Sequence, residues 1–254
     1  MEVKNLKFSY SDKSPLILDG ISFKLKEEKI TTILGPNGCG KSTLFSLMTK
    51  NLVPNEGSVT IGMRDINSMS NRDFAKKVAI VHQYNKVADD ITVEQLVSYG
   101  RTPYQKMMKR QSEYDSQMID WAIEATDLLE VRKRTVNSLS GGQRQRVWIA
   151  MALAQGTRYL FLDEPTTYLD IKYQLDILRL IKKLNEKLKI SIIMVLHDIN
   201  QAIAYSDYII GLRNGKILIQ GRPEKVINED SIEKLYGIKL KIGIIDDKKF
   251  ILGV

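Results

Sequence analysis

The chain has 254 residues, of which 43% are hydrophobic and 27% charged, and a formal net charge of +8. This composition indicates a soluble globular protein with one large α/β core, and no apolar run approaches the ~20 residues that a membrane-spanning helix needs. The single cysteine, Cys39, excludes an intramolecular disulfide. Because no apolar signal segment follows Met1, we expect a cytosolic chain whose membrane role, if it has one, comes through partners.

The basic residues are spread along the chain, and acidic residues stand between many of them. The clusters at 106–110, 132–134 and 182–189 favour a solvated, lysine-rich surface, and proximity to anionic lipid is the alternative. Aromatic residues do not interleave with these clusters as a single-strand binder requires. We therefore expect no nucleic-acid partner.

The first predicted elements are strands. Up to about residue 30 the chain alternates apolar and polar residues (VKNLKFSY, then ISFKLK), which predicts antiparallel strands with one buried face. Ile30–Leu34 is predicted to open a parallel core, and it runs into the Gly-rich sequence GPNGCGKST at 35–43. A helix is predicted over 42–50, directly after this loop.

The Gly-rich sequence 35–43, called the phosphate loop below, predicts a polyphosphate site. Its glycines let the backbone turn tightly and aim successive N–H groups at an anion, and the positive end of the following helix faces the same anion. We expect Lys41 to reach the β- and γ-phosphates and the Ser42 hydroxyl to hold Mg²⁺. The helix N-terminus is also expected to lower the pKa of Cys39, so that alkylation inactivates the protein and ATP protects it.

The middle of the chain has helical spacing from 93 to about 130. Its plausible buried positions are Leu96, Val97, Met118, Trp121, Ala122, Ala125 and Leu128. Another helix is predicted to begin after Ser140. Its apolar positions are Val147, Ile149, Ala150, Leu153 and Ala154.

Buried parallel strands are predicted at 159–162 and 190–196, which are nearly continuous apolar runs. Asp163 and Glu164 follow the first run, and His197 follows the second, at the strand ends where open α/β sheets bind ligands. Asp163 is expected to hold the hydration shell of Mg²⁺, and Glu164 to act as the general base on an attacking water. The alternative is a carboxylate pair that caps the next helix. The last residues predict a small hairpin that turns at 246–247.

Seven motifs, in order, resemble those of the ATP-binding subunits of ATP-binding cassette (ABC) transporters, and the resemblance spans essentially the whole chain. They are Tyr10, Gly35–Thr43, Gln83, Leu139–Gln143, Tyr159–Glu164, Leu169–Asp170 and His197. The resemblance implies an α/β fold of the P-loop NTPase (RecA-like) class. In this fold a mixed sheet core carries an N-terminal antiparallel β subdomain and an inserted α-helical subdomain.

The resemblance also implies one ABC ATPase domain over 1–254. Its parts are a nucleotide-binding core at 1–90 and 156–225, a helical signature subdomain at 91–155, and a C-terminal helix and hairpin at 226–254. The sequence LSGGQ at 139–143 is called the signature below. In the family it caps the γ-phosphate of a nucleotide held by a second subunit.

The implied site residues fall into three groups. Catalytic roles go to Glu164, His197, Lys41 and Gln83. Nucleotide binding goes to Tyr10, Asn37, Gly38, Cys39, Gly40, Lys41, Ser42, Thr43, Ser140, Gly141, Gly142, Gln143 and Asp170. The Mg²⁺ ligands are Ser42, Gln83 and Asp163. Open alternatives make Tyr10 an amphipathic strand residue and His197 a plain strand-end histidine, while His82 is interpreted as an ordinary loop or strand-end residue.

The resemblance implies ATP and Mg²⁺ as ligands and a head-to-tail homodimer, or a pair with a sister chain, as the active unit. The stretches 91–104, 164–176 and 196–207 are similar to ATPases of importers for iron–siderophore complexes, haem and vitamin B12, and fit the iron–siderophore group best. The implied partners are transmembrane permease subunits and, indirectly, an extracytoplasmic metal-chelate binding protein, at the cytoplasmic face of the membrane. The alternatives are another cargo, export, or a non-transport ABC ATPase.

Overall fold

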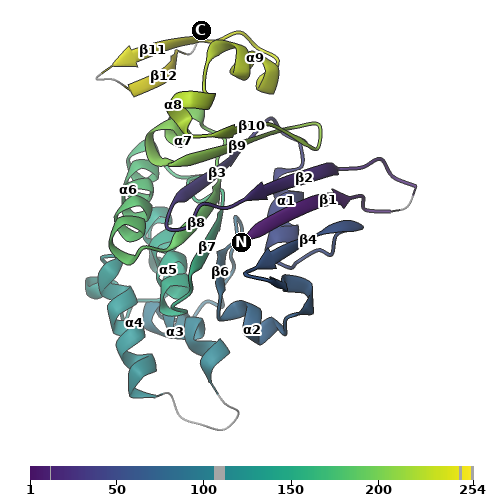
Figure 1. Cartoon of the computed structure of the whole chain (residues 1–254). Coiled ribbons are helices and arrows are strands. Elements are labelled where there is room, and N and C mark those ends of the chain that lie inside the picture. The colour runs from purple at the N-terminus through teal and green to yellow at the C-terminus, as the bar shows by residue number, and fades with distance from the viewer. Residues whose placement is uncertain (12, 106–111, 246–247, 253–254) are drawn as a thin grey trace. The chain divides into compact units, whose positions relative to one another are not determined.

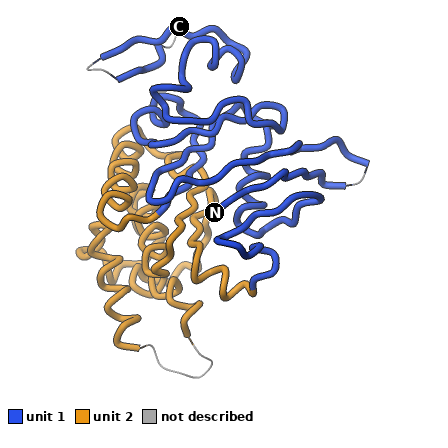
Figure 2. The backbone as a smooth tube through the Cα atoms, viewed as in Figure 1, with its two compact units in different colours: residues 1–69, 191–254 blue, residues 70–190 orange. Residues whose placement is uncertain are grey.

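The computed structural model describes residues 1–11, 13–105, 112–245 and 248–252 (Figure 1). Its contacts divide the chain into two compact units, coloured in Figure 2. Unit 1 comprises 1–69 and 191–254, and unit 2 comprises 70–190. These bounds differ from those of the three predicted domain parts, which stay a prediction.

Unit 1 begins with an antiparallel sheet in the order β2-β1-β4-β5. The strands are β1 (Glu2–Phe8), β2 (Leu18–Lys24), β4 (Glu56–Ile61) and β5 (Arg64–Asp65), and a 3₁₀ turn, η1 (Ile66–Ser68), follows. Val3 pairs with Phe23 and Leu6 with Ile21, and all four side chains are buried. The antiparallel strands predicted from the alternating pattern are confirmed.

The second sheet of unit 1 carries the strands that present the predicted site residues. Its strands are β3 (Ile30–Leu34), β8 (Ser191–Val195), β9 (Tyr208–Arg213) and β10 (Lys216–Gly221). β3 pairs in parallel with β8 and β9, and β10 pairs antiparallel with β9. Every residue of β3 and β8 is buried, which explains the nearly continuous apolar run of β8. α1 (Lys41–Met48) follows β3, and α7 (Ile199–Tyr205) follows β8.

Unit 2 contains a parallel strand pair, β6 (Val78–Val81) and β7 (Tyr159–Asp163), together with most of the long helices. The helices are α2 (Asn71–Ala75), α3 (Val93–Ser98), α4 (Glu113–Ala125), α5 (Gly141–Ala154) and α6 (Ile171–Leu188). Short 3₁₀ turns are η2 (Tyr99–Tyr104), η3 (Leu129–Val131) and η4 (Val136–Ser138). In Figure 1, α5 lies beside the strand pair, and α3 and α4 lie below it.

Three helices of unit 2 begin at capping boxes, in which the first and fourth residues exchange side-chain and backbone hydrogen bonds. Such boxes start α3, α4 and α5. All five apolar positions predicted for α5 are buried. Of the positions predicted for 93–130, Met118, Trp121 and Ala125 are only half-buried, because α4 is a surface helix with one buried stripe.

A buried ion pair ties these helices together. The Arg101 guanidinium donates to Asp115 Oδ1 at 2.7 Å and to the Ala154 carbonyl at 2.8 Å, and it lies 4.0 Å from the centre of the Tyr104 ring. Arg101 is 2% exposed and Asp115 6%. The pair therefore links η2 to the start of α4 and the end of α5.

Unit 1 ends in two short helices and a hairpin, the elements α8 (Pro223–Val226), α9 (Glu229–Tyr236), β11 (Lys241–Ile245) and β12 (Lys248–Leu252). β11 and β12 pair antiparallel, which confirms the predicted hairpin. Its predicted turn at 246–247 lies outside the described residues. The Asn200 side chain of α7 holds β12 by accepting from the Ile251 amide at 2.7 Å and donating to the Ile251 carbonyl at 3.1 Å.

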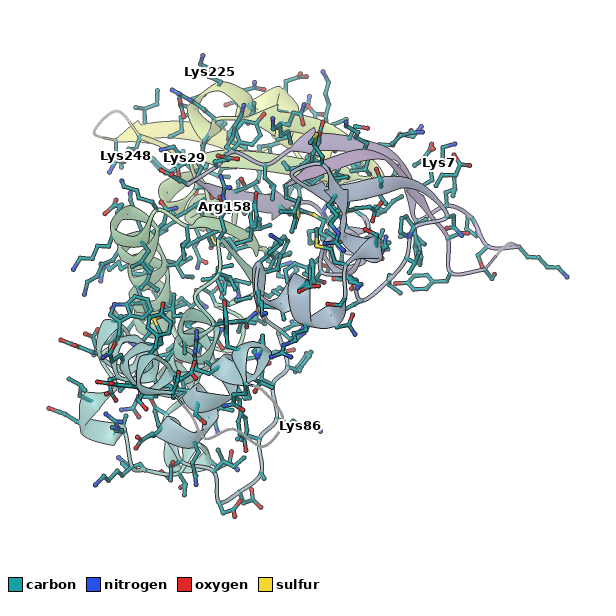
Figure 3. The ribbon with its side chains drawn as sticks, turned by 60° about the horizontal axis from the view of Figure 1, so that its bottom comes forward. Lys7, Lys29, Lys86, Arg158, Lys225 and Lys248 are labelled. Carbon is teal, nitrogen blue, oxygen red and sulfur yellow. The ribbon has the colours of Figure 1, made fainter. Side chains whose placement is uncertain are left out.

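The described basic side chains are dispersed, as the sequence predicted. Figure 3 places Lys7, on β1, well apart from Lys29 and Lys248 of the same unit. The predicted cluster at 106–110 lies outside the described residues. Among the described helices, none has the length and apolar character to cross a membrane.

Candidate functional site

The phosphate loop leaves β3 in a conformation that requires its glycines. Gly35, Gly38 and Gly40 have φ angles of +151°, +76° and +104°, in the region that side chains with a Cβ rarely adopt. A Cβ on Gly35 would lie 2.2 Å from the Leu212 carbonyl oxygen, and one on Gly40 would lie 2.7 Å from Leu18. Around Gly38 a Cβ would meet no atom within 4 Å, so this part of the loop is open to a ligand.

Lys41 lies at the start of α1, one residue earlier than the predicted helix. It is 5% exposed, and its Nζ donates to the carbonyls of Gly35 and Pro36 at 2.8 and 3.0 Å. The ammonium group is therefore held inside the loop. A buried ammonium that is bonded only to neutral carbonyls favours an anionic ligand nearby.

Other predicted nucleotide contacts surround Lys41 in unit 1. Asn37 and Ser42 are exposed, and Thr43 is buried. The Tyr10 hydroxyl lies 3.2 Å from Thr43 Oγ1, and its exposed ring packs edge-on against Phe8. Tyr10 follows β1 and lies outside it, so the alternative of a strand residue is wrong, and its role in stacking on adenine stays a prediction.

The expectation for Cys39 is wrong. Burial raises the pKa of the Cys39 thiol, because this effect outweighs the favourable charge of Lys41. Cys39 is 4% exposed. The helix N-terminus does not make this thiol reactive, because water is excluded from it.

In unit 2, Gln83 and Glu164 are already joined. Gln83 Nε2 donates to Glu164 Oε2 at 2.6 Å, and the Thr167 hydroxyl donates to the same oxygen at 3.0 Å. Glu164 follows β7 with a φ of +49°, so a tight turn directs its carboxylate. Both donors orient the carboxylate, as a general base requires.

The residues around this contact come from the turn after β7 and the segment after β6. Asp163 is the last residue of β7, and Asp170 immediately precedes α6. Tyr168 lies in the turn, and its hydroxyl is 2.7 Å from that of Tyr84. Sequence reasoning missed Thr167, Tyr84 and Tyr168, and no periodic pattern marks them.

The signature forms the start of α5, as predicted. The Ser140 hydroxyl accepts from the Gln143 amide at 3.3 Å, and Gln143 Oε1 accepts from the Ser140 amide at 3.2 Å. A Cβ on Gly142 would lie 2.6 Å from the Tyr173 ring, so glycine allows α5 to approach α6. Backbone N–H groups at the helix N-terminus form an anion site, which agrees with the predicted contact to a phosphate.

A backbone ladder connects the signature to the segment after Gln83. The amides of Val93 and Glu94 donate to the carbonyls of Arg134 and Arg132 at 3.0 and 3.1 Å, and the Val136 amide donates to the Ile91 carbonyl at 2.9 Å. The paired segments, 91–94 and 132–136, are called the ladder below. Movement after Gln83 is therefore mechanically linked to the residues before the signature.

His197 follows β8 and is exposed, in unit 1. Asp198 begins α7 by accepting from the Gln201 amide at 2.9 Å, and the role of His197 in sensing the γ-phosphate stays a prediction. Sequence reasoning also missed Tyr236 of α9. Burial raises the pKa of Tyr236 to about 12, although a hydrogen bond with the Gly35 backbone opposes this shift.

The residues present fit a nucleoside triphosphate, because the loop combines an open glycine, Gly38, with a buried ammonium and a helix N-terminus. Among the described residues, no group of three or more His, Cys, Asp or Glu side chains could hold a metal ion on its own. This suits Mg²⁺, which usually takes one or two protein ligands and completes its shell with water and phosphate. The shared site of Ser42, Gln83 and Asp163 stays a prediction.

Known proteins match this chain over nearly its whole length. A family model described as ABC transporter matches residues 18–167. The iron(3+)-hydroxamate import ATP-binding protein FhuC of Bacillus subtilis (strain 168) is 42% identical over 242 residues, 95% of this chain and 89% of that protein. The ferric enterobactin transport ATP-binding protein FepC of Escherichia coli (strain K12) is 39% identical over 231 residues, 91% of this chain and 84% of that protein.

A solved structure matches the fold as well. The dimeric, post-hydrolysis ATP-binding cassette MJ0796, bound to ADP and Pi, superimposes with a TM-score of 0.74 at 28% identity. The match covers 87% of this chain and 98% of that one. The phosphate loop at 35–43 and the signature at 139–143 both lie inside the matched region 18–167, while Tyr10 and His197 lie outside it.

Proposed function

The chain belongs to the ABC transporter family, and we propose that it is the subunit that hydrolyses ATP to drive import of an iron–siderophore or related metal chelate. Its fold is the predicted α/β P-loop NTPase fold, and it binds and hydrolyses ATP. The observation that carries the catalytic part of the proposal is the Gln83–Glu164 contact at 2.6 Å.

In the proposed mechanism, the chain's own residues bind the triphosphate and handle the proton. Lys41 and the amides of the phosphate loop hold the β- and γ-phosphates, and the Glu164 carboxylate accepts the proton of the attacking water. Mg²⁺, held by Ser42, Gln83 and Asp163, would neutralise phosphate charge. His197 is assigned to sensing the γ-phosphate.

The active unit is proposed to be a head-to-tail dimer. The signature amides at the start of α5 would cap the nucleotide bound by the partner subunit, so that neither subunit has a complete site alone. The related cassette MJ0796 is dimeric in its structure with ADP and Pi. Donors of the partner's signature would stabilise charge on the transferring phosphoryl group.

The proposed cargo rests on relatives and on the chain's own stretches. FhuC and FepC are named for the import of iron(3+)-hydroxamate and the transport of ferric enterobactin. The segments 91–104, 164–176 and 196–207 point to the same group. Haem, vitamin B12 or export are the alternatives, and a non-transport ABC ATPase is a further one.

The proposed permease contact is the surface that begins at Gln83 and continues to Arg101. Residues 83–87 of this stretch line a groove of about 500 Å³ in unit 2, together with Asn137, Arg144 and Trp148. From here the ladder leads to the signature. Binding of a permease at this surface would place the chain at the cytoplasmic face of the membrane as a peripheral subunit.

The test is to tag the Glu164→Gln protein in its host, solubilise membranes with ATP and Mg²⁺ present, and identify copurifying proteins by mass spectrometry. We expect a multi-span permease together with a metal-chelate binding protein. Lys41→Ala, which should bind nucleotide weakly, is the matched control and should recover less of the binding protein. Recovery of ribosomal proteins, or of soluble partners alone, would overturn the transport proposal. The assignment of the chain as an ATPase would still stand.

A further inference from the structure

Two tyrosines flank the pair formed by Gln83 and Glu164. Tyr84 is the next residue after Gln83, and Tyr168 ends the turn that Glu164 begins. Their hydroxyl oxygens lie 2.7 Å apart, and their rings are 6.0 Å apart at a tilt of 41°. The segment of Gln83 and Tyr84 is therefore joined twice to the turn after β7. One bond runs from the Gln83 amide to the Glu164 carboxylate, and the other joins the two tyrosine hydroxyls.

The turn that carries Glu164 and Tyr168 is strained at both ends. Glu164 has a φ of +49° and Tyr168 a φ of +64°, which are unfavourable for residues with a Cβ. Such conformations persist where surrounding contacts impose them. The hydroxyl contact to Tyr84 and the hydrogen bond from Thr167 to Glu164 are contacts of this kind.

We propose that Tyr84 and Tyr168 are positioning residues, whose hydroxyl contact holds the Gln83 amide against the Glu164 carboxylate and so orients the general base for hydrolysis. This rests on the proposed role of Glu164. Neither tyrosine belongs to the motifs that identified the family in the sequence.

The orientation of Gln83 follows from hydrogen-bond chemistry. A carboxylate only accepts, so the Gln83 amide must present its nitrogen to Glu164. Its oxygen, the end of the amide that can bind a cation, is then directed away from Glu164. If the segment at Tyr84 moves, both the base and this oxygen lose their fixed orientation.

The hydroxyl contact lies at the surface of unit 2. Tyr84 is 69% exposed and Tyr168 79%, which means that water competes for the contact. We therefore expect the loss of this hydrogen bond to change turnover by roughly 2- to 5-fold, the lower part of the range for a neutral hydrogen bond.

The experiment compares Tyr84→Phe, Tyr168→Phe and the double variant in the full-length protein. Phenylalanine keeps each ring and removes only the hydroxyl. Without nucleotide, amide hydrogen exchange of 82–87 should become faster in all three variants. With ATP and Mg²⁺, kcat should fall roughly 2- to 5-fold at an unchanged KM, and the double variant should be no worse than either single one, because one shared bond is lost.

Tyr114→Phe is the matched control. This tyrosine is 62% exposed on α4 in the same unit, and its ring lies 5.5 Å from the Arg101 guanidinium, so it should change neither exchange at 82–87 nor kcat. Unchanged exchange in the Tyr84 and Tyr168 variants would overturn the proposal, as would faster exchange with an unchanged kcat. The role of Glu164 is tested separately, by Glu164→Gln. If Glu164 were not the general base, this variant would keep its turnover, whatever the tyrosine variants show.

Discussion

At the scale of single residues, Glu164 gives the sharpest prediction. Glu164→Gln keeps the shape of the side chain and removes its basicity, so we expect turnover to fall by roughly 100-fold or more. ATP binding should persist, and the variant should accumulate as an ATP-bound dimer. Phosphate release and size-exclusion chromatography with ATP measure both effects. Hydrolysis at the normal rate would remove Glu164 from its proposed role.

Cys39 gives a second prediction at this scale. Its raised pKa means that little thiolate exists at neutral pH, and its burial blocks access. We expect iodoacetamide to modify it at least roughly tenfold more slowly than a free cysteine, whose pKa is near 8.5. The rate should increase as the pH rises through the raised pKa. Mass spectrometry of the alkylated peptide checks this, and rapid labelling at pH 7 would contradict the burial.

Among the elements, the Arg101–Asp115 pair predicts a large effect on stability. Arg101→Met leaves the buried Asp115 carboxylate without its cation, and we expect the free energy of unfolding to fall by about 3 kcal/mol. Urea denaturation measures it. A double variant, Arg101→Met with Asp115→Leu, should regain part of the loss, because no buried charge then remains.

The same pair predicts a dependence on pH. Burial alone would raise the pKa of Asp115, but hydrogen bonds from Ser112 and Arg101 lower it overall. A depressed carboxyl pKa stabilises the fold above the unfolded value of about 3.9 and loses this contribution as the pH falls through the folded value. The stability difference between the wild type and Asp115→Asn should therefore be full at pH 7 and shrink in acid.

Asn200 predicts how the C-terminal hairpin is attached. Asn200→Ala removes both hydrogen bonds to Ile251, so the Ile251 amide should exchange its hydrogen faster by roughly fivefold, as expected for about 1 kcal/mol. Asn200→Asp keeps an acceptor for this amide and should preserve most of its protection. Equal exchange in the alanine variant would mean that other contacts hold the hairpin.

Much at this scale could be predicted from the sequence because it depends on local patterns. Nearly continuous apolar runs identified β7 and β8, and the glycines of the phosphate loop identified a turn that the φ angles of Gly38 and Gly40 confirm. The contact of Tyr84 with Tyr168 joins exposed residues 84 positions apart, and no period or motif marks such a pair. The pKa of Cys39 was predicted wrongly because burial depth depends on distant chain segments.

For the whole molecule, the proposed dimer predicts a dependence on protein concentration. If each nucleotide needs the phosphate loop of one subunit and the signature of the other, a monomer should be nearly inactive. Specific ATPase activity should then increase with concentration until dimers predominate. A fixed specific activity from nanomolar to micromolar protein would contradict the shared site, unless light scattering finds a dimer throughout.

The ladder has a consequence for how this molecule can diverge. Its bonds join the main chain of 91–94 to that of 132–136, and main-chain bonds do not depend on which side chains these positions carry. The neighbouring surface can therefore acquire new residues, and with them a different membrane partner, while the connection to the signature is inherited unchanged. One cassette can be recruited to several transporters only if the surface residues that recognise the membrane partner can change while the main-chain bonds that lead to the signature stay the same.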